Sequence, residues 1–93
     1  MGYRSLRESE EFSASATRVP DYDYLEESFD GLTFAIAQAP EAFPVVPGFK
    51  TLRVARTYCV EVRGTWVPAL RIFFRIADEA MVDLLELDIL FED

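Results

Sequence analysis

The chain has 93 residues, of which 51% are hydrophobic, so it has material for the core of one small domain and no room for a second. Its formal charge of −8 argues at first against a nucleic-acid partner, and no apolar run approaches the roughly 18 residues of a membrane span. The N-terminus also lacks an apolar signal segment, so we expect no membrane association. The single cysteine, Cys59, excludes an internal disulfide framework and favours a cytoplasmic location, and the chain has no histidine to activate it as a nucleophile.

The first forty residues predict a weakly patterned N-terminal segment followed by one clear amphipathic helix. Residues 1–10 are polar, and we expect them to be loosely ordered. Residues 11–19 alternate weakly between apolar and polar side chains, which suggests a first strand at the edge of a sheet. Residues 21–39 carry the stripe of an amphipathic helix, with apolar residues at spacings of three and four, namely Tyr22, Leu25, Phe29, Leu32, Ile36 and Ala39.

This helix also has start and stop signals. Asp21 or Asp23 can cap its N-terminus, and Asp23 with Glu26 has the spacing of a capping box. Gly31 is a weak point at which the helix could kink or break, and Pro40 ends it. The acidic side chains of the helix are interpreted as a solvated face.

The second half predicts a loop and an antiparallel sheet. Residues 40–49 contain three prolines and a Pro-Gly turn signal, which indicate a loop. Strands are predicted over residues 50–55 and 58–62, and a reversal at 63–65 leads into a central strand that ends at Ile76. The loop's apolar residues are expected to tuck under the sheet: Phe43, Val45 and Val46.

The last segment, residues 80–91, is compatible with a strand or a helix. Its apolar residues alternate from Leu85 to Phe91, which favours a strand, whereas the spacing from Met81 to Asp88 also suits a helix. We predict a strand, because the short turn at Asp78-Glu79 makes pairing with the central strand the simplest closure.

The stretch Ala69–Ile76 is the most informative part of the central strand. With a two-residue period, its apolar face consists of Leu70, Ile72, Phe74 and Ile76. Its other face presents Arg71, Phe73 and Arg75. Guanidinium groups bind phosphates bidentately and stack on rings, so this face is suited to an anion or a nucleic acid. The alternative is that both arginines line the solvated side of a half-exposed sheet.

The charge is sorted by region along the chain. Residues 42–77 hold six bases and one acid, residues 1–41 hold three bases and nine acids, and residues 78–93 hold seven acids and no base. A local basic patch can steer a polyanion even on an acidic protein. We therefore predict that the bases of residues 50–75 form one contiguous patch, despite the acidic total.

No cofactor or metal is expected from the sequence. It contains no metal-ligand spacing, no glycine-rich phosphate loop and no nucleophile elbow. Acid pairs such as Asp78-Glu79 are interpreted as turn residues.

Four short segments in fixed order resemble the RelE/ParE toxin superfamily. They correspond to a helix ending near "NPE", a "PG…LR" lead into the sheet, an "R(I/V)xYR(I/V)" strand and a closing "(V/I)xLL" strand. In this chain they are Ala39-Pro40-Glu41, Val46-Pro47-Gly48-Phe49-Lys50-Thr51-Leu52-Arg53, Leu70-Arg71-Ile72-Phe73-Phe74-Arg75-Ile76 and Val82-Asp83-Leu84-Leu85-Glu86-Leu87. The resemblance covers roughly residues 21–90.

The resemblance implies an α+β fold, with a small antiparallel sheet and an N-terminal helix packed on one face. It also implies the toxin component of a type II toxin–antitoxin system, bound by a cognate antitoxin and acting on ribosome-bound mRNA or on gyrase. By motif position, Arg71 matches the central catalytic arginine, and Lys50 and Arg53 match the basic residues of the preceding strand. Arg56, Arg75 and Phe73 are the expected residues for contact with a phosphate or a partner.

The C-terminus departs from the family pattern. Active nucleases of the family usually carry a His, Tyr, Lys or Arg near the C-terminus, whereas this chain ends in Asp88-Ile89-Leu90-Phe91-Glu92-Asp93. Such a residue would transfer or orient a proton during cleavage. Residues 58–68 also form a longer link between strands than is usual. Two functions therefore remain open, an mRNA endonuclease and a non-catalytic binding module of the gyrase-inhibitor or protein-interaction type.

Overall fold

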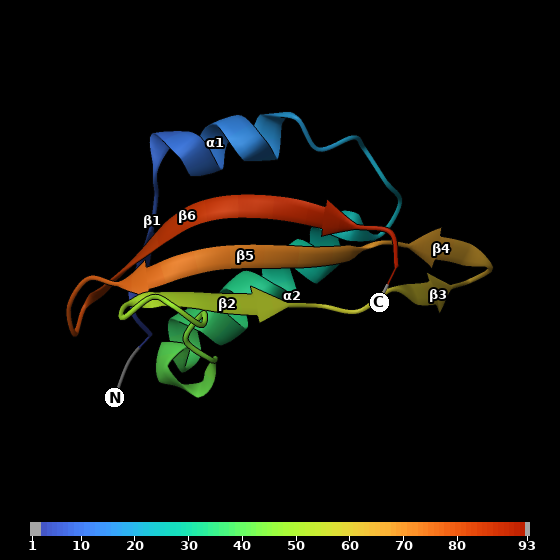
Figure 1. The fold of residues 1–93 in the computed structure, drawn as a ribbon. Helices are drawn as coiled ribbons and strands as arrows, with labels where there is room; N and C mark the ends of the chain where they lie inside the picture. The colour runs from blue at the N-terminus through green and yellow to red at the C-terminus, as the bar shows by residue number, and fades with distance from the viewer. Residues whose placement is uncertain (1–2, 93) are drawn as a thin grey trace.

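The computed structural model describes residues 3–92, in which two α-helices and six strands follow one another. In chain order these are β1 (Ser5–Glu8), α1 (Glu10–Thr17), α2 (Leu25–Gln38), a short 3₁₀ helix η1 (Pro40–Ala42), β2 (Leu52–Arg56), β3 (Val60–Val62), β4 (Thr65–Val67), β5 (Ala69–Ile76) and β6 (Met81–Leu90). Figure 1 shows the long strands β5 and β6 crossing the molecule, with α2 behind the sheet and α1 beside β6. The predicted α+β class is confirmed.

The main sheet is mixed rather than purely antiparallel. Its strand order is β1-β6-β5-β2, in which β1 runs parallel to β6 and the other pairs are antiparallel. Strands β3 and β4 form a separate two-stranded hairpin. Parallel neighbours need a long crossover connection, and here the chain passes through both helices and strands β2 to β5 between β1 and β6.

Strand β5 spans the predicted residues, and its apolar face is confirmed. Leu70, Ile72 and Phe74 are buried, with at most 1% of their surface exposed. They belong to one hydrophobic cluster with the apolar stripe of α2, which consists of Leu25, Phe29, Leu32 and Ile36. The predicted packing of this helix against the central strand is therefore present, and α2 covers one face of the sheet (Figure 1).

The N-terminal predictions need correction. The described part of residues 1–10, from residue 3 on, is not loosely ordered as expected, because it contains β1. The predicted strand at 11–19 is instead helix α1. Ser9 caps this helix by accepting a hydrogen bond from the Phe12 N–H at 3.0 Å, and the buried residues Phe12 and Ser15 are spaced by three. The capping serine and this spacing outweigh the weak alternation.

The start of α2 also differs from the prediction. The helix begins at Leu25, and its cap is Tyr24, with φ of 66° and no side-chain capping bond. The expected caps, Asp21 and Asp23, lie in the linker before it. Gly31 does not break the helix, which runs through this position without interruption.

The predicted strands are present with shifted ends. Strand β2 begins two residues later than expected, the predicted 58–62 strand is reduced to β3, and residues 80–91 form the strand β6 rather than a helix. The predicted reversal lies at the turn Arg63-Gly64, with Gly64 at φ of 79°. Pro68 interrupts the long central strand, so that β4 leaves the main sheet and pairs with β3. In the loop, Phe43 packs edge-on against Phe74 with ring centroids 5.9 Å apart, whereas Val45 is exposed.

Candidate functional site

The face of the sheet opposite α2 carries four of the residues that the sequence singled out, namely Arg56, Arg71, Phe73 and Arg75. Residues directly opposite each other in neighbouring strands share a face. By this register the surface comprises Arg7 of β1, Asp83, Glu86 and Asp88 of β6, Arg71, Phe73 and Arg75 of β5, and Leu52, Val54 and Arg56 of β2. We call this surface the open face, because neither described helix lies over it (Figure 1).

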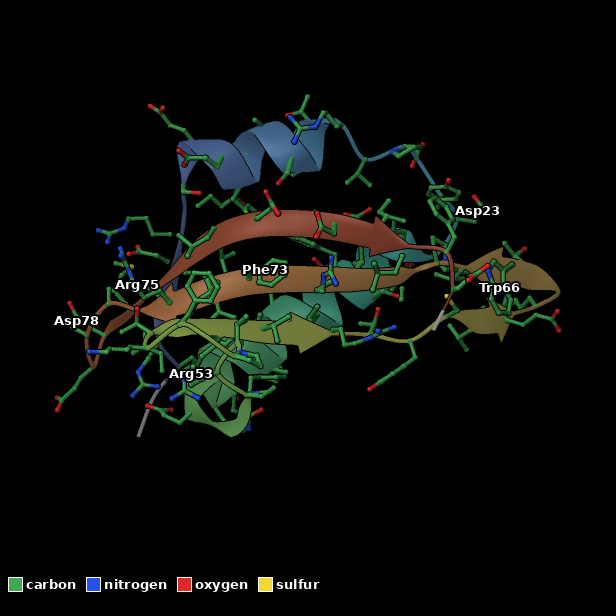
Figure 2. All side chains as sticks on the ribbon, in the orientation of Figure 1. Asp23, Arg53, Trp66, Phe73, Arg75 and Asp78 are labelled. Atoms are coloured by element: carbon green, nitrogen blue, oxygen red, sulfur yellow. The ribbon has the colours of Figure 1, made fainter. Side chains whose placement is uncertain are left out.

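The centre of the open face is an apolar strip. Phe73 lies between Val54 of β2 and Glu86 of β6, and Leu52 follows two residues before Val54 on the same face. Leu52, Val54 and Phe73 are half-buried, and none belongs to the hydrophobic cluster beneath α2. Figure 2 shows Phe73 and Arg75 on the side of the sheet away from α2. This strip is apolar surface that the described fold does not cover.

Ion pairs lie at both ends of the strip. At one end, Arg71 Nη2 donates to Asp88 Oδ2 at 2.8 Å. At the other end, Asp83 accepts from two arginines: its Oδ1 lies 2.6 Å from Arg7 Nε, and its Oδ2 lies 3.0 Å from Arg75 Nη2. Each predicted arginine of β5 therefore already has a carboxylate partner within the chain.

Asp83 is the centre of the larger ionic cluster. Its side chain is only 8% exposed, although both arginines beside it are largely exposed. Hydrogen bonds from Arg7 and then Arg75 lower the pKa of the Asp83 carboxyl, because they favour its charged form. The cluster joins β1, β6 and β5 across three neighbouring strands.

The predicted catalytic residues are not brought together. Arg53 lies opposite Phe74, on the face that α2 covers, and its Nη1 donates to the Phe43 carbonyl oxygen at 2.6 Å. Arg71 lies on the open face, and Lys50 is exposed in the loop before β2. The prediction of one contiguous basic patch is therefore wrong. So is the prediction of a common anion site formed by Lys50, Arg53 and Arg71.

The other predicted contact residues do share the open face. Arg75 and Phe73 lie there on β5, and Arg56 lies opposite Arg71. The guanidinium carbon of Arg56 lies 4.5 Å from the centroid of the Tyr58 ring, and that of Arg71 lies 5.1 Å from the centroid of Phe73. These distances are those of cation–π contacts.

One donor on Arg71 has no acceptor within the described residues. Its Nε is buried and makes no hydrogen bond, although Nη2 of the same group is paired with Asp88. A buried donor without a partner is unfavourable, so an acceptor oxygen brought by a binding partner would be stabilising at this point.

The sequence interpretation missed Arg7, Asp83 and Asp88 as members of this surface. A signal was present, because the predicted pairing of 69–76 with 80–91 places an acidic strand beside the arginines. The charge was counted for each region of the sequence separately, so the acids of residues 80–91 were not set against the arginines of residues 69–76. Regions of opposite charge that are separate in the sequence become neighbours in the sheet.

No protein-family model, curated protein or solved structure matches the chain. Within residues 3–92, no cluster of three or more His, Cys, Asp or Glu side chains is arranged to hold a metal ion. No helix in the same range is both long and apolar enough to cross a membrane.

Proposed function

We propose that the chain is a RelE/ParE-like protein-binding module, the toxin component of a type II toxin–antitoxin pair, which acts through contacts rather than through RNA cleavage. The observation that carries this proposal is the open face, where a half-buried apolar strip lies between ion pairs that already engage Arg7, Arg71 and Arg75. The toxin class itself rests on the motif resemblance.

The composition of the open face suits a protein partner better than RNA. A polyanion needs several basic side chains that are free to neutralise phosphates. Here Arg71, Arg75 and Arg7 are bound to carboxylates, and Glu86 lies opposite Phe73. A protein partner, in contrast, gains by covering apolar surface at the centre of a polar rim.

The occupant of this face is proposed to be the cognate antitoxin, with an apolar stripe and carboxylates at its ends. The open face holds four arginines and three carboxylates, whereas the whole chain has a net charge of −8. This face therefore repels an acidic partner less than the net charge of the whole chain would suggest. A partner carboxylate would also give the Arg71 Nε its missing acceptor.

The test is co-expression of the chain with the product of each adjacent reading frame. We expect growth inhibition by the chain alone, rescue by one neighbour, and a complex of the two that survives purification. Phe73→Glu places a charge at the centre of the strip and should abolish the complex, whereas Phe34→Glu, at an exposed ring on α2, should leave it intact. Normal growth with the wild type, and no complex with any neighbour, would reject the proposal.

The second candidate is a ribosome-dependent mRNA endonuclease. The observation that favours it is the same unpartnered Arg71 Nε, because a phosphate oxygen is an equally suitable acceptor. Transcript-end mapping separates the two candidates. Ribosome-dependent cleavage that disappears in Arg71→Ala supports the endonuclease, whereas Arg53→Ala serves as a comparison, since Arg53 bonds the loop carbonyl of Phe43.

A further inference from the structure

A pocket of about 510 Å³ lies between the linker that joins the two helices, the start of α2, and the sheet residues Leu70 and Leu87. It shares no residue with the open face. Its volume is within the range of small-molecule sites, which are roughly 300–1,000 Å³. The pocket is therefore a separate candidate for binding a small ligand.

The walls of the pocket are apolar and aromatic. Leu70 of β5 and Leu87 of β6 are buried and contribute from the sheet. Three rings line it as well, those of Tyr22, Tyr24 and Phe29. The Tyr22 ring is held in place by an edge contact with Phe91, with centroids 6.0 Å apart. Such walls are suited to methylene groups and, through the ring faces, to a cation.

The charged residues that line the pocket are all acidic: Asp21, Asp23, Glu26 and Glu27. None of these four carboxylates makes a hydrogen bond or an ion pair with the described residues, and no lysine or arginine in residues 3–92 lines the pocket. The N-terminus of α2 contributes the equivalent of only about half a positive charge, so the pocket remains strongly negative. Figure 2 shows Asp23 on the linker, at the end of the sheet where Trp66 also lies.

We propose that this pocket binds a linear polyamine, a chain of methylene groups that carries two or more ammonium groups. The methylene segments would lie against the partly exposed rings of Tyr22, Tyr24 and Phe29, above the buried Leu70 and Leu87, while the ammonium groups would meet the carboxylates and the tyrosine ring faces. The combination of an apolar wall with several carboxylates favours a multiply charged organic cation over a metal ion. A metal ion would need several oxygen ligands that converge on one point, and it would gain nothing from the apolar wall. This inference does not depend on the proposed toxin function.

The test is titration of the full chain with spermidine by isothermal calorimetry, with Mg²⁺ and a monoamine, butylamine, as comparison ligands. We expect saturable binding of spermidine, and weaker binding of both comparison ligands. Glu26→Gln/Glu27→Gln should weaken spermidine binding roughly five- to tenfold, since it removes two exposed charges from the pocket. Tyr22→Leu removes one ring while keeping an apolar side chain, and should weaken it roughly twofold or more.

Helix α1 supplies a matched control. Its first turn also carries two exposed acids, Glu10 and Glu11, but these do not line the pocket. Glu10→Gln/Glu11→Gln removes the same charge and should leave spermidine binding unchanged. Equal weakening by the two double variants, equal affinity for Mg²⁺ and spermidine, or the absence of saturable binding would overturn the proposal. Thermal melting of each variant checks that its fold is intact.

Discussion

The two faces of the four-stranded sheet differ in what the fold requires of them. On the face beneath α2, neighbouring side chains such as Ile72, Phe74 and Leu84 are almost fully buried in one cluster. On the open face, the alternate residues of β5, Arg71 and Phe73, are partly exposed and are held by an ion pair and a cation–π contact. One face therefore contributes stability through burial, whereas the other leaves apolar and charged groups partly exposed.

The largest expected effect separates two adjacent phenylalanines of β5. Phe74→Ala removes a fully buried ring and should lower the free energy of unfolding by about 3–5 kcal/mol. Phe73→Ala removes a half-buried ring from the open face and should lower it by only about 1 kcal/mol. Urea unfolding measures both values, provided that the m-value, the slope of the unfolding free energy against urea concentration, is the same for the two variants. Equal losses would mean that the open face also belongs to the core.

A smaller effect is expected where α1 covers the free edge of β6. The Ser15 Oγ accepts from the Leu87 N–H at 3.0 Å and donates to the Phe12 carbonyl at 2.8 Å. Ser15→Ala leaves a buried N–H without an acceptor and should lower the free energy of unfolding by about 1–3 kcal/mol. Ser13→Ala on the exposed side of the same helix is the control and should have little effect. If Ser15→Ala leaves the exchange rate of the Leu87 amide unchanged, this bond does not protect the edge.

The ionic cluster of the open face should give a smaller, pH-dependent contribution. The pKa of Asp83 is lowered on folding, so its contribution is complete above its unfolded pKa, near 3.8, and is lost as the pH falls through its folded value. The melting temperatures of wild type and Asp83→Asn should therefore differ at pH 7 and converge below pH 3.8. High salt should reduce the difference at pH 7, because Arg7 and Arg75 are largely exposed. A difference that stays constant with pH would contradict this account.

Much of the fold was predictable because strong local patterns coincided with tertiary packing. The period of β5 and the stripe of α2 each give a continuous apolar surface, and these surfaces pack together as expected. Helix α1 was not predictable from alternation, since its burial is confined to one side, at Phe12 and Ser15. Strand β1 is polar and short, and it exists because the edge of β6 supplies its hydrogen bonds.

Part of the candidate site was predictable from the sequence, but the pairing of its arginines with carboxylates was not. The sequence singled out Arg71, Phe73 and Arg75, and the structure places all three on one face. It could not show that Arg53 falls on the other face, because this depends on the pairing register of β2 with β5. The neutralising role of Asp83 and Asp88 likewise depends on the register of β6.

The central claim is that carboxylates of β6 hold the arginines of the open face, so that this face does not serve as an RNA-binding patch. The most direct measurement is a fluorescence anisotropy titration of a labelled single-stranded RNA oligonucleotide at about 0.15 M salt. The variant to compare with the wild type is Asp88→Asn, which removes the carboxylate that pairs with Arg71. We expect no saturable binding by the wild type, and binding by Asp88→Asn that weakens as salt is added. Saturable binding by the wild type that is lost in Arg71→Ala would contradict the account.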